Sequence, residues 1–160
     1  IGDFFFWFKI TEKDVIEAEK NNEPLIKMED LEGSLCLFDD LNQKSTILTK
    51  YMFGLNDDIQ INGRHKNISI IHILHNTNYK ETRFTLSEAG FYVFFLNTVK
   101  PTLRKIMVRY CGLTEKEATY LTDLENVRWV AIRTIGHQYI ITEKQIFSYK
   151  YLSDLVKNLP

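Results

Sequence analysis

The chain has 160 residues, of which 44% are hydrophobic and 13% aromatic, and its formal net charge is −1. This length is typical of one domain with a sizeable core, and the composition excludes a disordered chain. The near balance of charge excludes a chain-wide electrostatic affinity for nucleic acid or an anionic membrane, although a local basic face remains compatible with it.

The two cysteines, Cys36 and Cys111, are far apart and predict neither a disulfide framework nor a metal-ligand pair. We therefore expect a reduced, intracellular protein.

No apolar run reaches the ~18 residues of a membrane span. The apolar start has no basic leader and no cleavage site, so it is not a signal peptide. Because the chain opens on Ile1 and not on Met, we expect it to be a piece of a longer protein.

The first part of the chain predicts one strand and two helices. The aromatic run at residues 4–10 is typical of a strand. A helix is expected over residues 11–21, because its first residue and Asp14 form a capping-box pattern. A second, short helix is expected over residues 25–31. Residues 11–32 carry eight acidic residues and three lysines, a net charge of −5, which we interpret as a solvated acidic face.

Three short and continuous apolar runs predict strands buried on both faces, as in a parallel sheet, at residues 34–38, 68–74 and 91–96. Helices are expected at residues 44–55, 101–110, 114–124 and 147–159, and a hairpin around Gly136 at residues 128–133 and 138–142. This alternation predicts an α/β fold with a mostly parallel sheet flanked by helices, ending in a C-terminal hairpin and helix. We place a core at residues 1–125 and an extension at 126–160.

Two acidic residues, Asp39 and Asp40, directly follow the strand at 34–38, which is the Walker B arrangement. The carboxyl end of a parallel strand faces the ligand crevice of such folds, so Asp39 can hold a water on Mg²⁺ there. Asp40 faces a different way and can orient an attacking water. Taken alone, this pattern is also an ordinary strand exit.

Further motifs follow in a fixed order. Gly63-Arg64-His65 precedes the strand at 68–74, that strand ends in His75-Asn76, and Arg83 precedes the strand at 91–96. With the acidic pair, this order over about residues 34–100 resembles the genome-packaging ATPases of poxviruses, giant viruses and their relatives. Those proteins belong to the FtsK–HerA branch of the P-loop NTPases. The resemblance implies a partial P-loop NTPase core of the RecA/ASCE type.

The resemblance also implies ATP and Mg²⁺ as cofactors and a role for each matching residue. Asp39 would be the Mg²⁺-associated acid and Asp40 the catalytic acid. Arg64 would sense a γ-phosphate, including one bound to a neighbouring subunit. His75, with Asn76 beside it, stands where the family commonly has glutamine. Arg83 matches the arginine of the loop before the last core strand, and Thr85 replaces its usual asparagine partner.

The phosphate-binding loop of such enzymes, G-x-x-x-x-G-K-[S/T], is absent, because none of the seven glycines is followed by lysine. In the related ATPases this loop lies upstream, so we expect an N-terminally truncated protein that does not bind ATP tightly by itself. The missing strand would lie between the strands at 68–74 and 91–96. We therefore expect the isolated chain to be poorly soluble, or to pair those two strands directly.

The implied function is a homo-oligomeric ring that hydrolyses ATP to move viral double-stranded DNA into a capsid. Capsid components are its further partners, no membrane is involved, and the host cytoplasm, viral factory or virion is its location. Two alternatives stay open. One is a degenerate, non-catalytic domain that serves as a structural or partner-binding subunit. The other is a cellular DNA translocase or conjugation ATPase.

Two other groups of residues could suggest a site. A basic helix face, at Lys100, Arg104, Lys105 and Arg109, could contact DNA phosphates, but a solvated charged face is the simpler interpretation. His72 and His75 are three residues apart, which places them on opposite faces of a strand. Because a zinc site also needs more ligands, we do not expect a metal at this pair.

Overall fold

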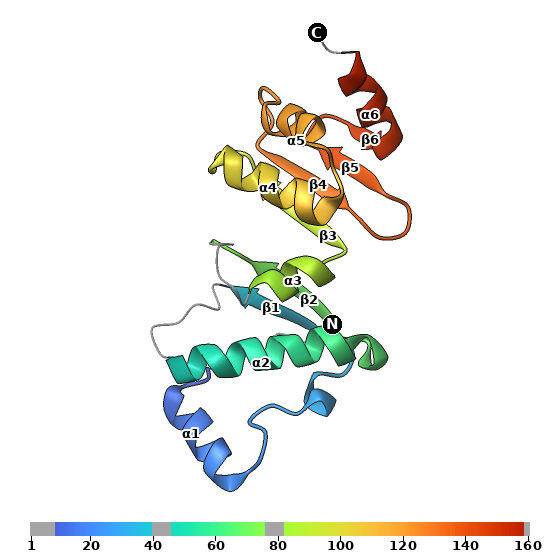
Figure 1. Ribbon diagram of the computed structural model, residues 1–160. Coiled ribbons are helices and arrows are strands. Elements are labelled where there is room, and N and C mark those ends of the chain that lie inside the picture. The colour runs from blue at the N-terminus through green and yellow to red at the C-terminus, as the bar shows by residue number, and fades with distance from the viewer. Residues whose placement is uncertain (1–8, 40–45, 76–81, 159–160) are drawn as a thin grey trace. The chain divides into compact units, whose positions relative to one another are not determined.

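The computed structural model describes residues 9–39, 46–75 and 82–158 of the chain (Figure 1). It has a mixed α/β fold that divides into two compact units, Ile1–Thr85 and Leu86–Pro160. The first unit contains a two-stranded parallel sheet and the second a four-stranded antiparallel sheet. None of the helices in the described ranges combines the length and the apolar composition that a bilayer span requires.

The first unit is built around one long helix. Its elements are α1 (Glu12–Asn21), the 3₁₀ helix η1 (Met28–Leu31), β1 (Leu35–Asp39), α2 (Thr46–Asn62), the 3₁₀ helix η2 (Gly63–Lys66) and β2 (Ser69–Ile73). β1 and β2 are paired in parallel from Leu35↔Ser69 to Asp39↔Ile73. Side chains of η1, β1, α2 and the residue before β2 form one core, made of Leu31, Phe38, Phe53, Ile59 and Ile68.

The helix α3 (Thr82–Glu88) begins in the first unit and ends in the second. The second unit continues with β3 (Phe91–Phe95), α4 (Lys100–Cys111), α5 (Glu115–Thr122), β4 (Trp129–Arg133), β5 (Tyr139–Thr142), β6 (Ile146–Ser148) and α6 (Tyr149–Lys157). Its strands follow the order β3-β4-β5-β6, and every pair is antiparallel. The helices α4, α5 and α6 supply Met107, Leu121 and Leu152 to the core, and these side chains have no exposed surface.

Predictions that depend on local signals are confirmed. Thr11 caps α1 with a full capping box, and Thr114 caps α5 in the same way. Gly112 ends α4 with a φ of 70°, a left-handed conformation that glycine adopts without strain. The hairpin around Gly136 is present as β4 and β5, and that glycine has a φ of 67°.

Other boundaries differ from the prediction. The short helix expected at 25–31 is only the 3₁₀ turn η1, and α2 continues to Asn62 and not to residue 55. The last helix is shorter than expected, because residues 146–148 form β6 before it. Of the strand expected at 4–10, residues 9 and 10 are not in a strand, and the rest lies outside the described residues.

The prediction of a mostly parallel sheet is wrong. β3 pairs with β4 in antiparallel fashion and belongs to a different sheet from β2, so these two strands do not pair with each other. Pairing with a strand later in the chain satisfies the backbone groups on one side of β3. The boundary expected near residue 125 falls inside the second unit, because β4, β5 and β6 continue the sheet that β3 begins.

The expectation that the strands are buried on both faces is also wrong. In β1, Leu35 and Leu37 are 62% and 56% exposed, and in β3, Phe91 and Phe95 are 49% and 60% exposed. Phe38 of β1 and Phe94 of β3, on the other faces, are buried. Each of these strands therefore has one covered face and one apolar face open to solvent within the described ranges.

Candidate functional site

The parallel pairing of β1 and β2 brings two of the predicted site residues together. Asp39 is the last residue of β1, and His75 lies two residues after the end of β2. His75 Nε2 is 3.4 Å from Asp39 Oδ1, and both side chains are largely exposed. The two strands thus end at one edge, where a carboxylate and an imidazole can meet a ligand. Asp40 and Asn76 lie outside the described residues.

Asp39 fits a limited part of a Mg²⁺ site. No group of three or more His, Cys, Asp or Glu side chains in the described part of the chain is arranged to hold a metal ion. Mg²⁺ in nucleotide sites keeps several waters and takes one or two carboxylates together with phosphate oxygens. An exposed carboxylate such as Asp39 can accept a hydrogen bond from a water of such an ion.

Arg64 lies away from this edge. It is an exposed residue of η2, which directly precedes β2, so it lies at the amino end of the strand whose carboxyl end leads to His75. A five-residue strand separates the two ends by roughly 13 Å. Arg64 and Asp39 therefore do not meet in one site within this chain.

The turn that carries Arg64 is held firmly. A Cβ added to Gly63 would lie 3.1 Å from Ile59 Cγ2 and 3.3 Å from Ile68 Cβ, so glycine allows η2 to pack closely against its neighbours. Lys66 at the end of the turn forms a 2.9 Å ion pair with Glu29 of η1. The backbone at Arg64 is thus fixed, whereas the Arg64 side chain is open to solvent.

Arg83 and Thr85 lie in a helix and not in the expected loop. Arg83 is the second residue of α3 and is exposed. Thr85 is buried, and its hydroxyl oxygen accepts hydrogen bonds from Asn56 Nδ2 at 3.2 Å and from Gln60 Nε2 at 3.1 Å. Thr85 therefore anchors the first turn of α3 to α2, which is a structural role.

Sequence reasoning missed a polar cluster made of Asn56, Gln60, His72 and Thr85. Gln60 Nε2 donates to Asn56 Oδ1 at 2.8 Å and lies 3.3 Å from His72 Nε2. Burial lowers the pKa of His72 to about 4. A polar pair four residues apart on a largely apolar helix, Asn56 and Gln60, was the available signal.

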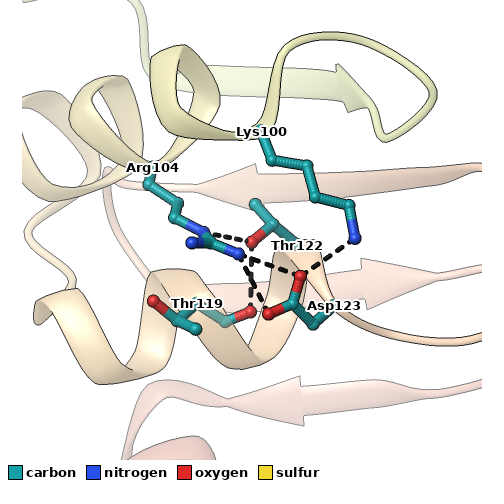
Figure 2. A network of polar contacts seen from close by, with 5 residues as sticks. All are labelled: Lys100, Arg104, Thr119, Thr122 and Asp123. Carbon is teal, nitrogen blue, oxygen red and sulfur yellow. Dashed lines mark hydrogen bonds and ion pairs between the residues drawn. The ribbon is translucent and has the colours of Figure 1, made fainter.

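The basic helix face is partly neutralised by one carboxylate (Figure 2). Asp123 accepts a hydrogen bond from Lys100 Nζ at 2.9 Å, and Arg104 Nη2 donates to both of its carboxylate oxygens at 2.9 Å. Arg104 Nε also donates to Thr122 Oγ1 at 2.8 Å. The hydrogen bond from Lys100, followed by the charge of Arg104, lowers the pKa of Asp123. These two cations therefore connect α4 to the end of α5, and Lys105 and Arg109 stay exposed.

Comparison with known proteins gives a distant relative from a virophage. The chain is 32% identical, over 107 residues, to the uncharacterized protein V3 of Sputnik virophage. The aligned part covers 64% of this chain but only 43% of the relative, so the chain spans less than half of the length of that protein. No family model matches the chain. No solved structure matches it either.

Proposed function

We propose that this chain is the C-terminal part of an ATP-hydrolysing motor that packages viral double-stranded DNA. The observation that carries the proposal is the contact of Asp39 with His75 at the shared carboxyl edge of a parallel strand pair. Ligands of open α/β sheets bind at this edge. The order of motifs along the sequence and a relative from a virophage support a viral packaging ATPase within that class.

In this proposal each residue at the edge has a separate role in phosphoryl transfer. Asp39 accepts hydrogen bonds from the waters of the nucleotide-bound cation and fixes its position. Asp40, one residue on, orients the attacking water. His75, with Asn76 beside it, donates a hydrogen bond to the γ-phosphate or to that water. Bound Mg²⁺ would supply charge neutralisation at the phosphates.

Arg64 completes a different site in the proposed ring. Because it lies at the opposite end of β2 from His75, it cannot reach the nucleotide that Asp39 holds. A guanidinium on a fixed turn can instead stabilise the developing charge on the γ-phosphate of a neighbouring subunit, as arginine fingers do in trans. The ATP sites would then lie between subunits.

A second candidate is a non-catalytic, partner-binding domain. It is favoured by one observation, namely that none of the seven glycines is followed by lysine, so the phosphate-binding loop is not in this sequence. The two candidates differ in what the complete reading frame encodes. An in-frame G-x-x-x-x-G-K-[S/T] upstream of Ile1 favours the motor, and its absence favours the non-catalytic domain.

The test is Mg²⁺-dependent ATP hydrolysis by the protein made from the complete reading frame, with and without double-stranded DNA. We expect hydrolysis that DNA stimulates and that Asp40→Asn lowers by roughly 10²-fold or more, since the variant loses the group that orients the water. Asp58→Asn changes an exposed carboxylate of α2 and should keep full activity. Absent hydrolysis rules out the motor, and hydrolysis that is equally fast in both variants rules out the role of Asp40.

A further inference from the structure

An open cleft lies between α1, the turn that follows it and α2. Its volume is about 430 Å³, and its lining includes Val15, Ala18, Leu25 and Tyr51 as an apolar floor. The Tyr51 hydroxyl is hydrogen-bonded to the Ile26 backbone, and burial raises the pKa of this group. The ring is therefore fixed as a wall of the cleft and remains uncharged at neutral pH.

Two carboxylates, Glu19 and Glu23, line the same cleft. Both residues are exposed, and neither forms an ion pair within the described part of the chain. Two other acidic groups nearby already have partners. Asp14 closes the capping box of α1, and Glu29 pairs with Lys66. Two of the unpaired carboxylates of this region thus lie at the mouth of an apolar cleft.

We propose that this cleft docks a lysine- or arginine-rich segment of a partner protein. A long basic side chain lays its methylene stem on apolar surface and keeps its charged head beside carboxylates. The cleft offers both parts, and its volume suits one or two such side chains and not a folded surface. The net charge of −5 over residues 11–32 attracts a basic segment and repels an acidic one. This surface is independent of the edge that carries Asp39.

The test is fluorescence anisotropy of a short labelled peptide in which lysine and leucine alternate, titrated with the 160-residue chain. We expect saturable binding that weakens as salt is raised, and no binding of the matched peptide with glutamate in place of lysine. The double variant Glu19→Gln, Glu23→Gln should bind roughly fivefold more weakly, because two exposed ion pairs are lost. Glu12→Gln removes an acid of the first turn of α1, outside the cleft, and should weaken binding much less than the double variant does.

A filling variant separates the cleft from general acidity. Ala18→Leu suits a helix and occupies the apolar floor, so we expect it to abolish binding while circular dichroism shows an unchanged fold. Binding that survives Ala18→Leu, or that Glu12→Gln weakens as much as the double variant, would overturn the proposal. Free spermidine that competes at the same concentration as the peptide would also overturn it, because the ligand would then be a small polyamine.

Discussion

His72 shows how a single buried base ties the stability of the first unit to pH. Its ring stacks on Phe38 with 5.3 Å between the centroids, and its Nε2 lies 3.3 Å from Gln60 Nε2. Nδ1 is buried without a hydrogen-bond partner among the described residues. A protonated ring would therefore carry its charge among apolar side chains and polar groups that are already hydrogen-bonded. This is why burial lowers the pKa of His72 to about 4.

The first unit should lose stability when the pH falls from about 6.5 to about 4, the value to which burial lowers the pKa of His72. In this window the unfolded chain binds a proton at His72 that the folded chain does not bind. The free energy of unfolding therefore decreases as the pH is lowered. Allowing for partial exposure of the ring, the loss is on the order of 1–2 kcal/mol. Hydrogen exchange of the α2 and β2 amides across this range measures it.

The variant His72→Leu should show a weaker pH dependence in that window than the unchanged chain. His65→Gln, which alters an exposed histidine of η2, should behave like the unchanged chain. A His72→Leu protein with the full pH dependence would show that other groups cause it.

At this scale the sequence named Asp39 and His75 as site residues but predicted neither their contact nor the polar cluster. The contact follows once β1 and β2 pair in parallel, since parallel strands end at one edge. The polar cluster depends on Thr85 and His72 reaching α2 from distant parts of the chain. Their types carry no local sign of that contact, and the motif around Arg83 predicted a loop where the structure has a helix.

At the scale of elements, the carboxylate of Asp123 links α5 to α4 by binding two cationic side chains of α4. Asp123 follows the last residue of α5, and Lys100 and Arg104 lie one turn apart on α4 (Figure 2). Arg104 donates to both carboxylate oxygens, which fixes the geometry as well as the distance. The side chain of Asp123 is 47% exposed, so this connection is screened by salt.

Asp123→Ala should lower the free energy of opening of α4 and α5 by about 0.5–1 kcal/mol, because partly exposed ion pairs are worth that much. Hydrogen exchange of the amides of these two helices measures the change. Asp154→Ala removes an exposed pair with Lys157 inside α6 and should have no measurable effect on α4 and α5. The difference between the two variants should shrink at high salt. Equal effects of both, or none at low salt, would refute the role given to Asp123.

The elements also show why some parts of a fold follow from sequence and others do not. The helix ends at Thr11, Gly112 and Thr114 are set by hydrogen bonds with residues only a few positions away. The local sequence pattern was therefore enough to predict these ends. Strand pairing is a contact over long sequence distances, and an apolar run such as that of β3 fits either a parallel or an antiparallel neighbour. The three residues of β6 are too few to give a periodic signal.

At the scale of the whole molecule, both sheets leave apolar strand residues exposed within the described ranges. Leu35, Ile71, Val93 and Phe95 are each about half exposed or more. Apolar surface that a strand leaves exposed marks interaction sites or promotes aggregation. Poor solubility of the isolated chain therefore stays a prediction, and these side chains are its physical basis.

The most direct test of the account uses the separation of Arg64 from Asp39. If the proposed ATP sites lie between subunits, Arg64→Ala and Asp40→Asn remove different parts of each site, and both proteins should be inactive alone. In an equal mixture of the two, about one quarter of the interfaces would combine an intact acid with an intact arginine from the neighbour. We predict that mixing restores Mg²⁺-dependent ATP hydrolysis to the complete protein. A mixture as inactive as its components would contradict an ATP site shared between subunits.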